Sequence, residues 1–166
     1  MKKILLQLFV IIIIVLSEST DAQWIMVNAL PQLNYLESVK FINTTTGFSV
    51  GGEGTILKTI DGGTNWIAQT SGITNTLHDV CFPDINNGTA VGDSGIILRT
   101  TNAGISWSQQ TSGKENNLYG VFFTDVYNGT TVGEGGKILR TTNGGINWTS
   151  QSSGTTNDLR GVSFTN

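Results

Sequence analysis

Cysteine, histidine and proline are scarce in this chain of 166 residues, and only 13% of its residues are charged. The single cysteine, Cys81, has no partner for an internal disulfide. The single histidine, His78, lies at a loop edge and makes a weak catalytic candidate. A net charge of −3 argues against nucleic acid or an anionic membrane as a partner, because both bind clustered Lys and Arg. No metal-ligand spacing is present, so we expect no metal and no cofactor.

The one long hydrophobic run stands at the N-terminus. Two lysines precede the apolar run Ile4–Leu16, and a polar stretch then leads to Ala22. This order is typical of a cleavable secretory signal peptide, and the run is shorter than the roughly 20 residues that span a bilayer. We therefore predict a signal peptide over residues 1–22 that is cut before Gln23. A secreted or cell-surface location follows, with no membrane span in the mature chain.

A period of 41 residues governs the rest of the chain. Trp66, Trp107 and Trp148 keep this step, and other apolar and glycine positions share it: Phe41, Phe82, Phe123 and Phe164; Gly51, Gly92 and Gly133; Leu57, Leu98 and Leu139. A fixed period of this length marks a repeat architecture. The repeats run over 36–76, 77–117 and 118–158, with a partial repeat over 159–166.

Each repeat contains four short strands. In residues 77–117, Val80 and Phe82 alternate as one face of a strand does, and Ile96–Thr100 is an apolar run too short for a helix. Glycine-rich turns separate the strands. The prediction is an all-β fold: a β-propeller of four-stranded antiparallel blades, incomplete at about 3.5 blades over residues 23–166, since closed propellers have roughly four to eight blades.

This incompleteness leads us to expect a piece of a longer chain. Trp24 stands one residue from the position that the period assigns to a tryptophan, so the chain enters on the last strand of a blade. It stops in the first strand of a fourth repeat. The alternative is closure of the ring by self-association through the open blade edge, since exposed β edges invite pairing.

The third turn of each repeat carries the most specific local pattern. It reads Thr-Ile-Asp-Gly-Gly-Thr-Asn-Trp over 59–66 and recurs, with Asn in place of Asp, over 100–107 and 141–148. An Asp or Asn before a glycine folds its oxygen onto backbone N–H groups, and the tryptophan then covers the turn. The residues assigned to these structural turns are Asp61, Gly63, Trp66, Asn102, Gly104, Trp107, Asn143, Gly145 and Trp148.

This turn resembles the Asp-box, or BNR, repeat. With Val-Gly-x-x-Gly-x-Ile-Leu before it and Gln-x-Ser-Gly after it, the unit is similar to the repeats of photosystem II stability/assembly factor-like propellers over residues 24–166. The resemblance implies an exported, non-catalytic scaffold that binds a protein or a glycan. The alternative is part of a sialidase-like or glucanase-like glycoside hydrolase, because related hairpins occur in those enzymes.

Two sets of repeated charges are candidate binding groups. Lys58, Arg99 and Arg140 share one repeat position and would form an arc of cations for an anionic partner, or each would pair with a neighbouring strand. Asp93 and Glu134 share another position, at a hairpin turn, where paired carboxylates could serve glycosidase chemistry or remain solvated turn residues. Ligand binding itself is expected at the loops between the blades, whose sequences differ.

Overall fold

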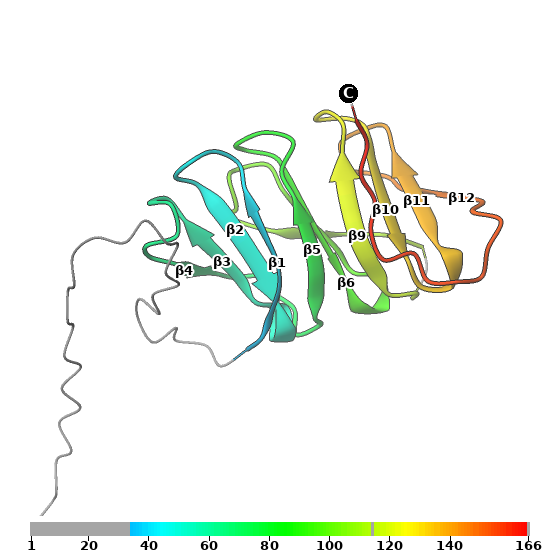
Figure 1. Cartoon of the computed structure of the whole chain (residues 1–166), viewed down its shortest axis with the longest axis horizontal. Helices are drawn as coiled ribbons and strands as arrows, with labels where there is room; N and C mark the ends of the chain where they lie inside the picture. The colour runs from blue at the N-terminus through cyan, green and yellow to red at the C-terminus, as the bar shows by residue number, and fades with distance from the viewer. Residues whose placement is uncertain (1–33, 114, 166) are drawn as a thin grey trace, which may run out of the picture.

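The structure, a computed structural model, describes residues 34–113 and 115–165 (Figure 1). It contains three four-stranded antiparallel sheets, each a simple meander in chain order. The all-β propeller predicted from the period is confirmed, with one sheet for each of the three complete repeats. The predicted signal peptide and the entering strand near Trp24 lie outside the described residues.

The three sheets are called blades 1, 2 and 3 below. Blade 1 comprises β1 (Leu36–Phe41), β2 (Gly47–Gly51), β3 (Ile56–Thr59) and β4 (Ile67–Gln69). Blade 2 comprises β5 (Leu77–Cys81), β6 (Gly88–Gly92), β7 (Ile97–Thr100) and β8 (Ser108–Gln110). Blade 3 comprises β9 (Leu118–Phe123), β10 (Gly129–Gly133), β11 (Ile138–Thr141) and β12 (Thr149–Gln151). Short 3₁₀ turns join the second and third strands of each blade: η1 (Gly52–Gly54), η2 (Asp93–Gly95) and η3 (Glu134–Gly136).

The first strands of the three blades lie side by side. β5 contacts both β1 and β9, and each of these strands pairs with only one strand within its own sheet. They are therefore the inner strands, and the sheets fan outward from them (Figure 1). The free edges of the inner strands face the axis around which a propeller is built.

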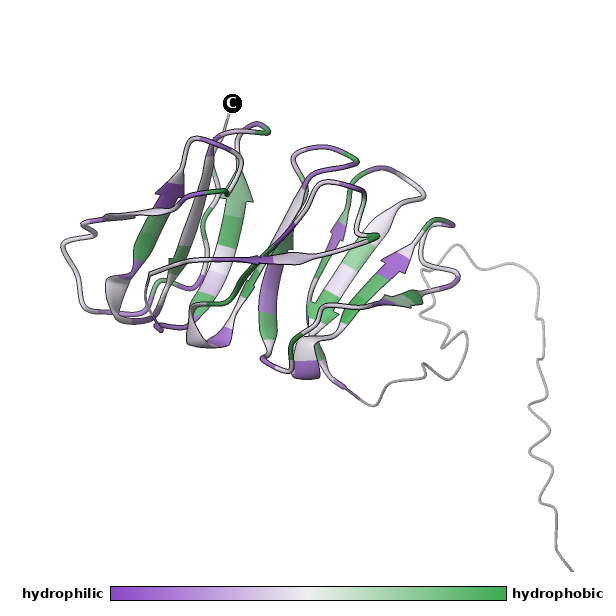
Figure 2. Ribbon diagram, turned by 180° about the vertical axis from the view of Figure 1, so that it is seen from behind, coloured by the Kyte–Doolittle hydropathy of each residue, from purple (hydrophilic) through white to green (hydrophobic). Residues whose placement is uncertain are grey.

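The core lies between the blades. The Phe48 ring of blade 1 stacks on Phe82 of blade 2 at 4.1 Å and meets Trp107 edge-on at 6.4 Å. A second cluster joins blades 2 and 3 around Val91, Ile97 and Leu118. Apolar residues recur along the strands in Figure 2, and β2 and β6 are buried along their whole length, as expected for thin sheets that bury both faces against neighbours.

The last described segment, 159–165, lies against blade 3. The Leu159 N–H donates to the Gly133 carbonyl at 3.0 Å, and the Phe164 ring lies 6.0 Å from Phe122. Figure 1 shows the segment running beside β9, where the inner strand of a fourth blade would stand. The segment belongs to none of the three sheets.

Within the part of the chain that the structure describes, no helix is long and apolar enough to cross a membrane.

Candidate functional site

The two ends of the blades differ in character. At one end of each blade, the loop from the preceding blade meets the 3₁₀ turn. The inner strand begins at this end, and the second strand ends there. Backbone contacts hold these parts together: the Asp93 N–H donates to the Thr76 carbonyl at 3.0 Å, and the Glu134 N–H donates to the Asn117 carbonyl at 2.9 Å. We call this the loop end. The opposite end carries the Asp-box turns and is called the turn end.

The Asp-box turns are held together by their own side chains. The Asp61 carboxylate accepts hydrogen bonds from the Asn65 N–H at 2.9 Å and from the Thr59 hydroxyl at 2.8 Å, and Gly63 N–H donates to that hydroxyl. The bonds from Asn65, followed by the bond from Thr59, lower the pKa of Asp61. Asn102 and Asn143 accept equivalent bonds in blades 2 and 3.

The tryptophan of each Asp-box turn meets a phenylalanine of the same blade edge-on. The centroid distances are close to 6 Å for the pairs Trp66–Phe41, Trp107–Phe82 and Trp148–Phe123. The Trp148 indole N–H also donates to the Gly145 carbonyl at 3.1 Å, whereas the buried Trp107 indole N–H has no partner among the described residues. These contacts close each hairpin and give the Asp-box residues a structural role.

The repeated cations belong to the turn end. Lys58 Nζ donates to the Ala103 carbonyl at 2.7 Å, and Arg99 Nε donates to the Gly144 carbonyl. Each cation thus joins its blade to the Asp-box turn of the next blade. The third cation, Arg140, is exposed and has no hydrogen-bond partner among the described residues. The acceptors are backbone carbonyls, not the carboxylates of Asp93 or Glu134.

Those two carboxylates are held in separate contacts at the loop end. Asp93 Oδ1 lies 2.7 Å from His78 Nε2, and Glu134 Oε2 accepts the Asn117 N–H at 3.1 Å. Their contacts orient loops and do not aim both groups at one point. The described residues contain no group of three His, Cys, Asp or Glu side chains able to hold a metal ion. Cys81 is buried between blades 2 and 3, and this burial raises the pKa of its thiol.

A β-bulge interrupts each inner strand near the loop end. Leu77 pairs with Gly92 and Asp79 with Val91, which leaves His78 unpaired; Glu37 and Tyr119 are skipped in the same way in β1 and β9. A bulge re-aims the side chain of its extra residue, and bulges are common beside functional sites. Arg160 holds the equivalent position in segment 159–165.

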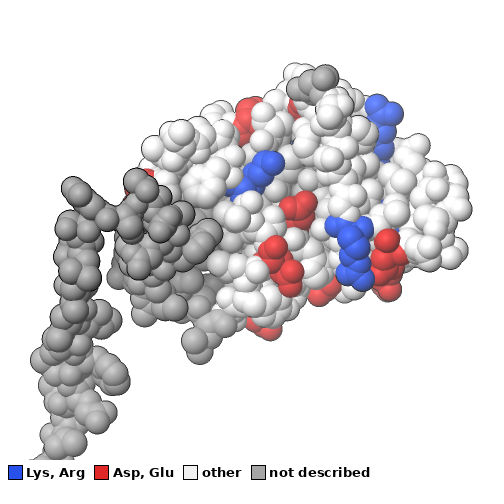
Figure 3. All heavy atoms as spheres, viewed as in Figure 1, with Lys and Arg blue, Asp and Glu red and all other residues white. Residues whose placement is uncertain are grey.

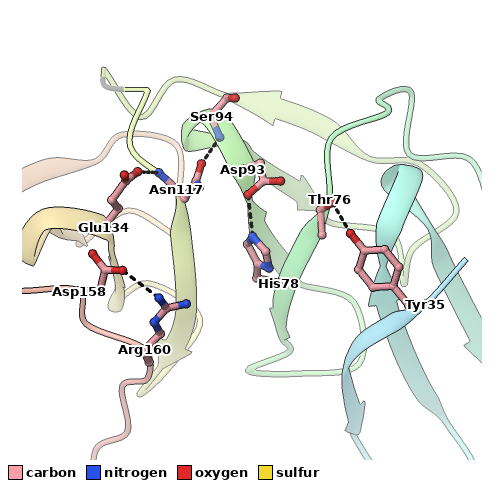
Figure 4. A network of polar contacts seen from close by, with 9 residues as sticks. All are labelled: Tyr35, Thr76, His78, Asp93, Ser94, Asn117, Glu134, Asp158 and Arg160. Atoms are coloured by element: carbon pink, nitrogen blue, oxygen red, sulfur yellow. Dashed lines mark hydrogen bonds and ion pairs between the residues drawn. The ribbon is translucent and has the colours of Figure 1, made fainter.

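These four side chains, Glu37, His78, Tyr119 and Arg160, are called the bulge row. The His78 and Tyr119 rings meet edge-on at 5.3 Å, and the Arg160 guanidinium lies 4.2 Å from the Tyr119 ring centroid. Arg160 Nη2 also lies 2.9 Å from Asp158 Oδ2 (Figure 4). His78 was only a weak catalytic candidate from the sequence. Its position nevertheless carries a signal, because it varies between a leucine one residue earlier and a valine two residues later that recur in every repeat.

Charge on the molecular surface is mixed. Figure 3 shows basic and acidic side chains interspersed on the face seen in Figure 1, with no continuous patch of one sign.

Comparison with known proteins agrees with this architecture. The family model described as "Photosynthesis system II assembly factor YCF48" matches residues 16–114 and 68–150, which together cover most of the chain. The chain belongs to the YCF48 family. The predicted resemblance to BNR-repeat propellers of the photosystem II assembly factor type is thereby confirmed. No curated protein matches the sequence.

Solved structures of YCF48 share the fold. A structure described as YCF48 bound to D1 peptide has a TM-score of 0.67 and 28% sequence identity, and the match covers 75% of this chain and 42% of that one. YCF48 from Cyanidioschyzon merolae has the same TM-score at 25% identity, covering 76% and 42%. The chain thus spans less than half the length of these YCF48 structures.

An ancestral GH74 enzyme is also similar, with a TM-score of 0.56 and 18% identity over 68% of this chain and 18% of that enzyme. At this identity the similarity shows the shared fold alone.

Proposed function

We propose that this YCF48-family chain is part of an exported, non-catalytic β-propeller that binds a protein partner at its loop end. The observation that carries the proposal is the similarity to a YCF48 structure bound to a D1 peptide, which extends over 75% of the chain. A peptide ligand on a relative favours a protein over a glycan as the partner. Export rests on the N-terminal sequence alone.

The loop end is the better candidate surface for physical reasons. The turn end is occupied by contacts that hold the fold: Asp61 is hydrogen-bonded within its own hairpin, while Lys58 and Arg99 reach the next blade. At the loop end, side chains differ from blade to blade on a constant scaffold. Loops placed on a rigid scaffold are where binding residues concentrate.

Partner capture from extracytoplasmic extracts of the source cells tests the proposal. The tagged full chain is cross-linked and its partners are identified, while fluorogenic sialosides and β-glucans are offered in parallel. We expect a discrete cross-linked protein and no turnover. Turnover of either substrate would show that the protein is a glycoside hydrolase and not a scaffold. Retention on a glycan column without a protein partner would show that the partner is a glycan and not a protein.

Two further measurements address export and assembly. N-terminal sequencing of the mature protein should begin at Gln23, and an intact residue 1–22 segment would exclude the proposed cleavage. Native mass measurement tests self-association through the open blade edge, for which a discrete oligomer of the 23–166 chain is the expected sign.

A further inference from the structure

The bulge row differs from the rest of the inner strands in its chemistry. At the flanking repeat positions the residues are constant, with Leu36, Leu77, Leu118 and Leu159 before the row and Val39, Val80, Val121 and Val162 after it. The row itself holds an acid, an imidazole, a phenol and a guanidinium. In blades 2 and 3 the leucine and the valine are buried in the core, whereas the bulge leaves the intervening residue unpaired. At this position the side chain therefore changes from blade to blade without entering the core.

Each member of the row keeps a polar group unused. Glu37 has an exposed carboxylate without a hydrogen bond, and the Tyr119 hydroxyl likewise has no partner among residues 34–113 and 115–165. His78 uses Nε2 toward Asp93 and leaves Nδ1 free. Arg160 gives one Nη2 contact to Asp158, and its side chain is 71% exposed.

Three of the four side chains are also fixed in place. Tyr119 lies between His78 and Arg160, and each of these two is held in turn by a carboxylate, Asp93 or Asp158. Asp158 is itself anchored, because its Oδ1 accepts the Gly135 N–H at 3.1 Å. Side chains ordered before binding lose less conformational entropy when a ligand arrives. Figure 4 shows the contact of His78 with Asp93 and that of Arg160 with Asp158, which order these two side chains.

The row has a direction. Its blade 1 end carries the carboxylate of Glu37, and its far end carries the guanidinium of Arg160, whose stacking on Tyr119 leaves edge N–H groups for a carboxylate. The steps from His78 to Tyr119 and from Tyr119 to Arg160 measure 5.3 and 4.2 Å. Each step exceeds one residue of extended chain, about 3.3–3.6 Å, and falls short of two.

We infer that the bulge row binds a short extended segment of the protein partner, with a basic side chain of that segment at Glu37 and a carboxyl group at Arg160. The inference rests on the proposed function: it names the residues that bind the partner and the charges that the bound segment carries. The segment crosses the free edges of the inner strands, and its charge order sets its direction along the row. Asp158 and Glu134 near the Arg160 end disfavour a purely acidic segment, so the ligand needs both signs.

The probe is an end-blocked, fluorescein-labelled hexapeptide with two lysines at one end, two serines in the middle and two glutamates at the other end. Two uniform peptides, with lysines or with glutamates at both ends, are the comparison. Fluorescence anisotropy with the full chain is measured at low salt, where exposed charges are least screened. We expect the dipolar peptide to bind at least about threefold more tightly than either uniform peptide.

Charge reversals in the protein test whether Glu37 and Arg160 hold the two ends of the peptide. Glu37→Lys and Arg160→Glu should each weaken binding of the dipolar peptide about three- to tenfold. The double variant should restore it, because the peptide then lies in the opposite direction. Arg140→Glu, a reversal of an exposed arginine at the turn end, is the matched control and should change nothing. Thermal unfolding of every variant shows whether segment 159–165 stays in place, and Glu37→Lys on β1 tests the row independently of that segment.

The inference is overturned if no peptide binds at about 1 mM, if the dipolar peptide has no advantage, or if the double reversal binds as weakly as the single ones. An equal loss in Arg140→Glu also overturns it, since the effect would then be general electrostatics. Partner capture that survives both single reversals leaves the proposed function intact and removes the row as its site. If the peptide binds but no protein is captured, the bulge row stands as a peptide-binding site and the proposed protein partner is excluded.

Discussion

The ammonium group of Lys58 lies 2.7 Å from the carbonyl oxygen of Ala103, so the third strand of blade 1 is fastened to the Asp-box turn of blade 2. The same ammonium lies 5.5 Å from the centroid of the Phe48 ring, in the core between these blades. Arg99 repeats the contact one period later, on the Gly144 carbonyl. A basic residue at this position is therefore a fastening between blades, which explains why it recurs without a nearby carboxylate.

Lys58→Met removes this fastening while keeping most of the side-chain bulk. The Ala103 carbonyl loses a charged donor, and hydrogen bonds to charged groups contribute about 1.5–3 kcal/mol. Because Lys58 is only half-buried, we expect a loss of about 1–2 kcal/mol in the free energy of unfolding. Urea denaturation monitored by tryptophan fluorescence measures it.

Arg140→Met supplies the matched control. Arg140 occupies the same repeat position, but it is exposed and has no hydrogen-bond partner within the described part of blade 3. Its replacement should change the free energy of unfolding by no more than about 0.5 kcal/mol. Equal losses in the two variants would show that the inter-blade hydrogen bond contributes little.

Gly104 is a test of how tightly the blades approach each other. Its φ of +78° favours glycine, and a Cβ there would lie 2.5 Å from the ring of Phe48 in the neighbouring blade. Gly113 has a similar φ of +70°, with nothing within 4 Å of its Cβ position. Gly113→Ala should therefore cost about 1–2 kcal/mol for the backbone alone.

Gly104→Ala adds the steric overlap to the same backbone cost. Overpacking in a filled core costs about 1–3 kcal/mol more, so we expect a total of about 2–5 kcal/mol. The difference between the two alanine variants in thermal or urea unfolding isolates the inter-blade packing. A difference near zero would mean that the Phe48 ring moves aside at little cost.

The period of 41 residues predicts the fold closely because every core position repeats with it. Phe82 and Trp107 stand in the same roles as Phe123 and Trp148, and their edge-on contacts are nearly identical. The glycine turns are equally local, since each is fixed by residues a few positions away. These features depend on short stretches of sequence, which is why they could be predicted.

The contacts of the candidate site were harder to predict from the sequence, for two physical reasons. The acceptor of Lys58 lies 45 residues away on another blade, and no local pattern indicates a backbone carbonyl. The bulge did leave a trace, because Leu77 and Val80 face the core three residues apart where strict alternation needs two. That extra residue is His78, and its contact with Tyr119 depends on how the blades pack.

The Asp-box and Asx turns predict how stability depends on pH. Hydrogen bonds from Asn65 and Thr59 lower the pKa of Asp61, and bonds from Asn128 and the Tyr127 N–H lower the pKa of Asp125. A carboxylate with a depressed pKa in the folded state stabilises the fold fully above its unfolded pKa, near 3.9, and this stabilisation is lost as the pH falls through the folded value. We therefore expect the free energy of unfolding to be flat near neutral pH and to fall below about pH 4.

Asp61→Asn separates the charge from the hydrogen bonds. Asn102 and Asn143 show that asparagine accepts the same backbone and hydroxyl bonds at this position. The variant should be less stable than the wild type near pH 7, because it lacks the charge and the second oxygen that accepts the Asn65 side-chain amide. It should lose stability less steeply between about pH 4 and pH 2. Urea midpoints measured across this range provide the test. Parallel curves for the two proteins would show that Asp61 makes no contribution to the acid transition.

Asp79 links the inner strands of all three blades. Its carboxylate accepts the Ser38 hydroxyl of β1 at 2.8 Å and the Val121 N–H of β9 at 2.9 Å. Asp79→Ala leaves both donors without this acceptor in a half-buried position, and each unsatisfied group costs about 1–3 kcal/mol. We expect a total loss of about 2–4 kcal/mol in urea unfolding.

Ser38→Ala is the matched variant, because it removes one hydrogen bond and leaves the Val121 contact intact. It should cost about 0.5–1.5 kcal/mol. Asp79→Asn should fall between the two, since an amide offers one accepting oxygen where the carboxylate offers two. Were Asp79→Ala to unfold at the urea concentration of the wild type, the inner strands would be held by apolar packing alone, and the carboxylate would have no part in joining the blades.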